Sequence, residues 1–237
     1  MKSLAKFNPE MPKTVTELFR QITAVSSQTL AQPQNLIPSL ARIAQRIVAV
    51  GFSKTISQEW SYLVKKGAIK DEFSPHIKYC ILEFLNFLES EMPDEERFQI
   101  MKKILFVAAS ESEGEREKRM AHTYMKIIKL LSSEEILIMN AIYSIYKNER
   151  SKIQDLKNTN NGRNSVFPDD WLNLISLESG LKYKELVVLQ EQKLIDKQLI
   201  LSRISRGGMI RVDENFRLSS LGLGIWEYIS KYDKLKH

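Results

Sequence analysis

The order of apolar patterns between Ser132 and Ile229 constrains the fold of this chain more than any other feature of its sequence. Three patterns with helical spacing come first, and two runs with the composition of β-strands follow. A further short run then leads into a last helix. This order predicts a small, mainly helical domain with one antiparallel β-hairpin. The predicted segments before the last helix are Ser132–Asn148, Asp169–Ser179, Lys182–Leu194, Leu199–Ser205, Met209–Asp213 and Phe216–Ser219.

The part of the chain before Ser132 predicts a bundle of helices. Only 9 glycines and 7 prolines occur among the 237 residues, which disfavours an all-β fold with many turns. We therefore expect a mainly α protein with two domains, residues 1–131 and residues 132–237. Gly51 is expected to end one helix of the bundle, and a separate helix is expected to follow. The predicted starts of the helices before Ser132 include Thr14, Pro38, Lys54, Ser74 and Asp94.

Two helix starts carry the Ser/Thr-x-x-Glu pattern, in which side chain and backbone donors satisfy each other. One runs from Thr14 to Glu17 and the other from Ser132 to Glu135. The helix that begins after Ser132 is apolar on nearly all sides, so we expect it to lie between two layers of structure. It is the predicted joint between the two domains.

The charge balance permits an anionic partner without requiring one. The chain carries 35 Lys and Arg against 29 Asp and Glu, a net charge of +6 with a pI of about 9.2. Cys80 is the only cysteine, which excludes an intramolecular disulfide and a cysteine-based zinc site and indicates a reducing, cytoplasmic location. The N-terminus is too short and polar before Pro9 for a secretory signal, and no apolar run of about 18 residues predicts a membrane span.

A helix, a turn with Gly180 and a second helix describe a helix-turn-helix unit. We expect the second helix to turn Leu186, Leu189 and Leu194 inward. In DNA-binding versions of this unit, the N-terminal residues of the second helix meet base edges in the major groove. Here the candidate DNA-binding residues on that helix are Lys182, Tyr183 and Lys184. Glu185 and Glu191 on the same helix are expected to oppose a polyanion.

The predicted hairpin supplies three more candidate DNA-binding residues. Arg203, Arg206 and Arg211 lie on or beside its tip, where Gly207-Gly208 suits a tight turn. Such a hairpin can follow a phosphate backbone, or it can be an ordinary solvated hairpin whose arginines protect its edge or contact a protein. Residues 150–237 hold 15 Lys and Arg against 11 Asp and Glu, which favours a polyanion contact in this part of the chain.

The C-terminal layout resembles bacterial winged-helix proteins. The resemblance rests on the helix pair Asp169–Leu194, with Lys193 where glycine is usual, and on the later run Phe216–Gly222. It implies an α domain with a small antiparallel β-hairpin. A helical half joined to such a module is also similar to the Abi-alpha proteins associated with abortive phage infection, through the stretches Ser132–Ile145 and Phe216–Glu227. That resemblance implies a bacterial protein with a role in antiviral defence.

No pattern in the chain predicts catalysis or a cofactor. The three histidines, His76, His122 and His237, lack metal-ligand spacing. Cys80 belongs to an apolar helical stripe, where cysteine behaves as a small hydrophobe. Phosphate-binding and dinucleotide-binding glycine loops are lacking as well. We therefore expect a protein that is not an enzyme and has no cofactor, metal ion or small-molecule ligand.

Two functions remain open. The first is a non-enzymatic nucleic-acid-binding protein, a regulator or defence component, that contacts DNA through the six candidate residues. The second is a protein-interaction adaptor, in which the winged helix is a packing module and the helical half holds a partner. A protein partner or a homodimer would fit this second hypothesis, and the terminal helix with Ile225, Trp226, Tyr228 and Ile229 is either core or dimer interface.

Overall fold

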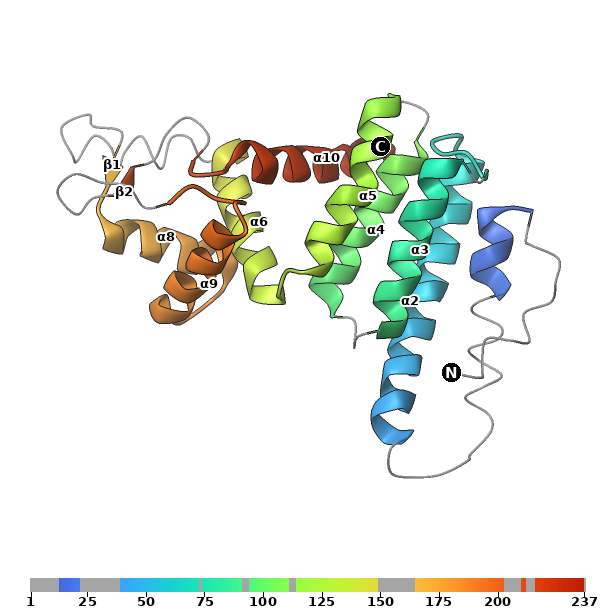
Figure 1. Cartoon of the computed structure of the whole chain (residues 1–237), viewed down its shortest axis with the longest axis horizontal. Helices are drawn as coiled ribbons and strands as arrows, with labels where there is room; N and C mark the ends of the chain where they lie inside the picture. Colours follow the sequence, from blue (N-terminus) through green and yellow to red (C-terminus); the bar gives the residue numbers. More distant parts are fainter. Residues whose placement is uncertain are drawn as a thin grey trace. The chain divides into compact units, whose positions relative to one another are not determined.

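The computed structural model describes residues 13–21, 39–72, 74–90, 94–110, 114–148, 165–202, 210–211 and 216–236. The backbone alone is described for residues 39–50, 89, 90, 115, 148, 165 and 211. Within these ranges the chain is mainly helical, as the sequence predicts (Figure 1). It folds as two compact units. The first comprises Met1–Lys129 with Tyr232–His237, and the second comprises Leu130–Lys231. No helix of the described ranges combines the length and hydropathy needed to cross a membrane.

The first unit is a bundle around an aromatic core. A short helix covers residues 15–21, and four longer helices follow. In Figure 1 the helices α3, α4 and α5 lie side by side, and α2 packs against α4. Tryptophan and phenylalanine side chains fill the centre, among them Trp60, Phe84, Phe98 and Phe106. The longer helices are α2 (Ser39–Lys65), α3 (Pro75–Ser90), α4 (Glu95–Ala109) and α5 (Glu115–Lys129).

The expectation that Gly51 ends a helix is wrong. Helix α2 continues through Gly51, whose carbonyl accepts a hydrogen bond from the Thr55 hydroxyl at 3.0 Å. A glycine inside a helix costs only about 1 kcal/mol relative to alanine. Starting a new helix is unfavourable by comparison, because the first turn fixes several dihedral angles for one hydrogen bond. Continuation past Gly51 therefore gives one long helix where two were predicted.

Polar side chains start the helices of the first unit where the sequence places them. The Thr14 hydroxyl accepts a hydrogen bond from the Glu17 amide at 3.2 Å. The Ser74 hydroxyl accepts one from the Ile77 amide at 3.3 Å, and Asp94 caps α4 through the Arg97 amide at 2.8 Å. Each bond satisfies an amide that has no partner within its own helix.

Glu59 lies at the centre of a charged cluster in the first unit. Lys102 Nζ lies 2.8 Å from Glu59 Oε2, and Lys236 Nζ lies 3.0 Å from Glu59 Oε1. The Tyr232 hydroxyl also donates to Glu59 Oε1. The Tyr232 ring stacks on Phe106 at 5.8 Å between centroids. We call Glu59, Lys102, Tyr232 and Lys236 the Glu59 cluster; it joins the last turn of the chain to α2 and α4.

The second unit is built around α6. A complete capping box begins this helix: the Ser132 amide donates to Glu135 Oε2 at 2.6 Å, and the Glu135 amide donates to Ser132 Oγ at 3.2 Å. Lys197 Nζ adds an ion pair to the buried Glu135 carboxylate at 2.5 Å. The elements of this unit are α6 (Ser133–Asn148), β1 (Ser165–Val166), α8 (Pro168–Ser179), α9 (Lys184–Asp196), β2 (Ile210–Arg211) and α10 (Ser220–Lys236) up to Lys231.

Helix α6 packs against three other helices of its unit, in agreement with its apolar circumference. It contacts α8 and α9, and its Asn140 side chain accepts a hydrogen bond from Trp226 Nε1 of α10 at 2.7 Å. Gly222 allows the close approach at the start of α10, since a Cβ there would lie 2.1 Å from the Leu199 carbonyl oxygen. The apolar side of α10 is core, because these side chains are buried: Ile225, Trp226, Tyr228 and Ile229.

The predicted hairpin is not shown by the described residues. The two residues of β2 pair antiparallel with β1, in the register Ser165 with Arg211 and Val166 with Ile210. Ile200, in the first predicted hairpin strand, forms an isolated antiparallel bridge with Leu218. The predicted tip between these runs lies outside the described residues. The sequence did not predict β1, because a strand of two residues is too short for an alternating pattern.

Candidate interaction face on helix α9

The turn before α9 exposes the start of that helix. Gly180 ends α8 in the left-handed conformation, with φ of 73°, which glycine adopts without steric cost. The Ser176 hydroxyl donates to the Leu181 carbonyl, and the Leu181 amide donates to Ser179 Oγ at 3.3 Å. These bonds hold the connection, and α9 begins at Lys184. The helix pair predicted between Asp169 and Leu194 is therefore present.

The inner side of α9 carries a buried ion pair, and this corrects the expectation for Glu191. Glu191 and Arg217 each have about 1% of their side-chain surface exposed, and Arg217 Nη1 lies 2.7 Å from Glu191 Oε1. Trp171 Nε1 of α8 donates to the same carboxylate oxygen at 2.7 Å. Glu191 therefore faces neither solvent nor a polyanion; it is part of the core. We call Glu191, Arg217 and Trp171 the Glu191 cluster.

Backbone strain accompanies the Glu191 cluster. Phe216 and Arg217 have φ of 52° and 70°, a conformation that costs a residue with a Cβ roughly 1–2 kcal/mol. Several contacts hold it: Arg217 Nη2 donates to the Leu201 carbonyl at 3.1 Å, and the Leu201 amide donates to the Arg217 carbonyl at 2.6 Å. The guanidinium also lies 5.3 Å from the centre of the Trp171 ring. The cluster thereby ties the segment before α10 to the inner side of α9.

The outer side of α9 is partly apolar, and the expectation that Leu189 faces inward is wrong. Leu189 is 53% exposed and Val188 is 40% exposed, whereas Val187 and Leu194 are fully buried. The run Val187-Val188-Leu189 contains the signal for this, because three consecutive residues of a helix cannot share one face. The α9 face, as we define it, consists of Glu185, Val188, Leu189, Gln192, Lys193 and Asp196.

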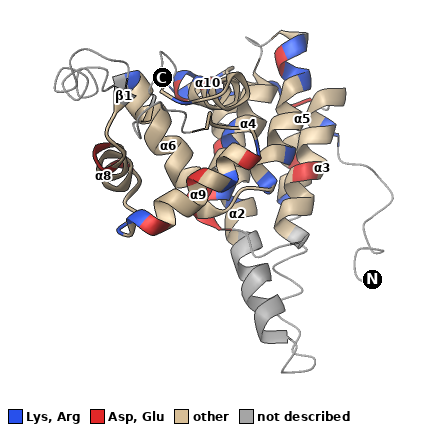
Figure 2. Cartoon of the chain, turned by 60° about the vertical axis from the view of Figure 1, so that its left-hand side comes forward, with Lys and Arg blue, Asp and Glu red and all other residues tan. Residues whose placement is uncertain are grey.

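Acidic and basic positions occur together along α9 (Figure 2). Glu185 lies in the first turn of the helix and Lys193 in the last, and both side chains are exposed. Gln192 Nε2 donates to Asp196 Oδ1 at 2.9 Å on the same side. The α9 face therefore combines two apolar side chains at its centre with charges of both signs around them.

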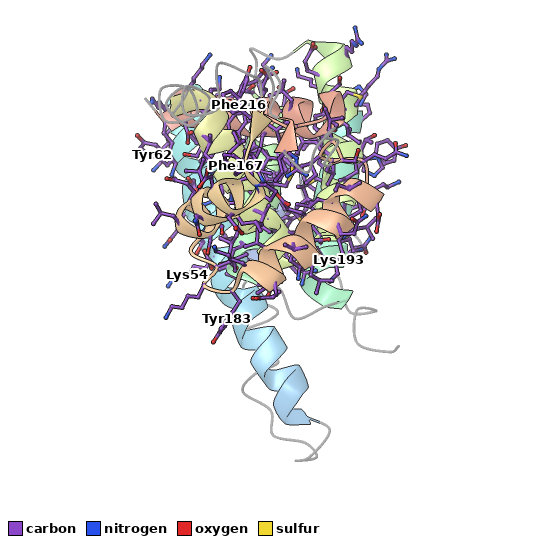
Figure 3. All side chains as sticks on the ribbon, turned by 90° about the vertical axis from the view of Figure 1, so that its left-hand side faces the viewer. Lys54, Tyr62, Phe167, Tyr183, Lys193 and Phe216 are labelled. Carbon is purple, nitrogen blue, oxygen red and sulfur yellow. The ribbon has the colours of Figure 1, made fainter. Side chains whose placement is uncertain are left out.

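The six predicted DNA-binding residues are described to different extents. Lys182 and Tyr183 are exposed before the start of α9, and the Tyr183 side chain, 71% exposed, projects away from the ribbon (Figure 3). Lys184 is half-buried at the first position of the helix. Arg211 lies in β2, described by its backbone alone, and Arg203 and Arg206 lie outside the described residues.

The charge excess does not concentrate in the second unit. Leu130–Lys231 holds 14 Lys and Arg against 13 Asp and Glu, whereas the first unit holds 21 against 16. The excess counted for residues 150–237 arises because that range leaves out three glutamates and one lysine and takes in two lysines and one aspartate at the end of α10. The residues concerned are Glu134, Glu135, Glu149, Lys147, Lys234, Lys236 and Asp233. With almost balanced charge, the second unit has a weak electrostatic basis for binding a polyanion.

Cys80, His76 and His122 lie in the first unit. Burial raises the pKa of Cys80 to about 12, and the nearby Glu83 carboxylate adds to the rise. His122 Nε2 lies 3.4 Å from Glu83 Oε1, and its ring lies 5.5 Å from that of Tyr79. In the described part of the chain, no group of three or more His, Cys, Asp or Glu side chains could hold a metal ion.

Comparisons with protein families, with curated proteins and with solved structures found no match for this chain.

Proposed function

We propose that this chain is a non-enzymatic protein-interaction adaptor, whose second unit is a winged-helix-like packing module that binds another protein through the α9 face. The observation that carries the proposal is the exposure of Leu189 beside Val188 on a helix whose opposite side is fully packed. Adjacent apolar side chains rimmed by polar ones are typical of protein contact surfaces. This proposal moves the partner site from the helical half to α9.

The order of elements supports the winged-helix part of the proposal. Helix α6, strand β1, the helix pair α8 and α9, strand β2 and helix α10 follow one another along the second unit. The antiparallel pairing of β1 with β2 forms a small sheet of two short strands in this unit. In this proposal α9 occupies the position that DNA-binding members of the superfamily use for reading bases, and presents a face of mixed charge there.

Nucleic-acid binding is the second candidate, and the start of α9 favours it. Lys182 and Tyr183 are exposed beside the N-terminus of the helix, where backbone amides and the helix dipole attract an anion such as a phosphate group. The full proposed contact set is Lys182, Tyr183, Lys184, Arg203, Arg206 and Arg211.

Site-specific photo-crosslinking tests the first candidate. A photoreactive amino acid at position 189 should crosslink the chain to a protein in cells that express it. The matched control is the same amino acid at Asn173, an exposed polar position on α8, which should give no such product. No protein crosslink from position 189, or equal crosslinking from both positions, would remove the α9 face from the proposal.

A gel shift with mixed-sequence DNA at increasing salt tests the second candidate. Lys184→Ala combined with Arg206→Ala should weaken retention and flatten its salt dependence if these residues contact phosphate. Unchanged retention in the double variant would exclude both residues. Salt-sensitive retention that the double variant loses, without a crosslink from position 189, would replace the adaptor by the nucleic-acid-binding protein.

A further inference from the structure

We infer that the partner of the α9 face is a second copy of this chain, with the two α9 helices antiparallel and crossing at Leu189. The inference rests on the proposed function and names its partner. A twofold-symmetric contact uses the same surface on both copies, so that surface must be complementary to itself. The charges and apolar side chains of the α9 face meet this requirement.

Two charged residues of the α9 face, Glu185 and Lys193, are arranged symmetrically about Leu189. Glu185 lies four residues before it and Lys193 four residues after it, on the same side of the helix because side chains at this spacing are neighbours. With a rise of about 1.5 Å per residue, each charge lies roughly 6 Å along the axis from the crossing point. In an antiparallel pair, Glu185 of each copy therefore comes beside Lys193 of the other.

Asp196 is the other acidic position of the α9 face, and its side chain accepts a hydrogen bond from Gln192 Nε2 of the same copy. Lys182 precedes the start of α9 at Lys184, so helical spacing gives it no place on the face. The orientation of the two copies therefore rests on Glu185 and Lys193. A parallel arrangement would instead place Glu185 beside Glu185 and Lys193 beside Lys193. The charges thus select the antiparallel orientation, since like charges brought together repel.

The apolar side chains at the centre of the α9 face supply the attraction between the two copies, and the charges set their orientation. Leu189 would pack against its own counterpart at the crossing, with Val188 and Gln192 beside it. This contact removes from water the apolar surface that the second unit leaves exposed on α9. One helix face forms an interface at the small end of the range for specific contacts. The dimer should therefore dissociate on dilution.

The same charges make a second copy a better occupant than a polyanion. Two acidic side chains, Glu185 and Asp196, lie on the α9 face beside a single lysine, Lys193. A polyanion would meet repulsion from both carboxylates, whereas a second copy presents Lys193 to Glu185. Self-association thus pairs Glu185 with Lys193 across the contact, and polyanion binding would use Lys193 alone.

Charge reversal in the purified full-length chain tests the inference. Glu185→Lys and Lys193→Glu should each weaken self-association by roughly tenfold, because two attractive pairs become two repulsive pairs. An equimolar mixture of the two variants should restore association as a heterodimer, and the double variant E185K/K193E should restore the homodimer. Sedimentation velocity across a concentration series measures each case. The control is Glu227→Lys on α10, at an exposed position outside the face. It changes the net charge as Glu185→Lys does and should have no effect on self-association.

The outcomes separate this inference from the proposed function. A monomer at all concentrations, or self-association that no charge reversal changes, overturns the antiparallel α9 pair. If position 189 still crosslinks to a different protein, the adaptor stands with another partner. If the mixture of reversed variants associates and each variant alone does not, the antiparallel pair is established. Thermal unfolding of each variant then distinguishes a loss of self-association from a loss of folding.

Discussion

Each unit contains a carboxylate that contacts a cation and an aromatic side chain. The two carboxylates differ in the type of cation and in their exposure to solvent. In the Glu191 cluster, an arginine and a tryptophan share one carboxylate oxygen in a site closed to solvent. In the Glu59 cluster, two lysines and a tyrosine surround a carboxylate that keeps some contact with solvent. The planar guanidinium can bond several acceptors at once, whereas a lysine acts as a point charge on a flexible stem.

Burial decides how much each carboxylate contributes to stability. A buried ion pair replaces lost hydration, so removing one partner leaves an uncompensated charge in the core. A partly exposed pair is screened, and water can take the place of either partner. The Glu191 cluster should therefore be intolerant of substitution, and the Glu59 cluster should tolerate it better. The following experiments test this contrast in order of expected effect.

Glu191→Leu should lower the free energy of unfolding by about 3–5 kcal/mol, because it removes the negative charge beside the buried Arg217 guanidinium and the acceptor of the Trp171 indole. Urea unfolding measures the change. Glu185→Ala is the control on the same helix; its exposed side chain predicts a change within about 0.5 kcal/mol. Similar losses in both variants would show that the burial of Glu191 contributes nothing.

Leu194→Ala should cost about 2–5 kcal/mol of stability, since Leu194 is fully buried on the inner side of α9. Leu189→Ala, the same substitution five residues earlier, should change stability by less than about 0.5 kcal/mol and should weaken self-association instead. Thermal or urea unfolding and sedimentation velocity give the two measurements. Equal destabilisation by both substitutions would mean that α9 packs on both sides within one chain.

Glu59→Gln should cost about 1–2 kcal/mol, less than the loss at Glu191, because solvent reaches this carboxylate. Urea unfolding again measures the change. Lys236→Ala removes the more exposed of the two lysines and should cost at most about 0.5 kcal/mol. If Glu59→Gln proved as costly as Glu191→Leu, partial exposure would not explain the contrast between the clusters.

Cys80, the only cysteine, should have the smallest effect near neutral pH, where its thiol is protonated in both the folded and the unfolded chain. Because burial raises its pKa to about 12 from 9.0, the folded chain should resist a thiol reagent at pH 8. The unfolded thiol ionises first as pH rises above 9.0, so this contribution to stability is present below pH 9.0 and is lost toward pH 12. Unfolding at several pH values should show a shallower decline above 9.0 in Cys80→Ala. Rapid labelling of the folded chain would contradict the burial.

The helix starts could be predicted because their interactions are local. Ser132 with Glu135, Thr14 with Glu17, and the left-handed Gly180 act over four residues or fewer, so short sequence patterns contain the necessary information. The helix pair α8 and α9 and the mainly helical class followed from such patterns. Lys182 and Tyr183, predicted as the first residues of the second helix, precede its start at Lys184, and the partner they contact stays a prediction.

Burial was decided by residues far apart in the chain. Glu191 looks like a solvated residue until Arg217, 26 positions later, and Trp171, 20 positions earlier, close around it. Leu189 looks like a core residue because leucine usually is one, yet the side of α9 that the unit buries carries Val187, Glu191 and Leu194, and Leu189 faces outward. Local patterns in the sequence were sufficient for the mainly helical class and for the capped helix starts, but not for the uninterrupted course of α2 through Gly51. The run Val187-Val188-Leu189 requires one side chain to face outward, and only contacts with distant residues select which one, because burial depends on tertiary packing.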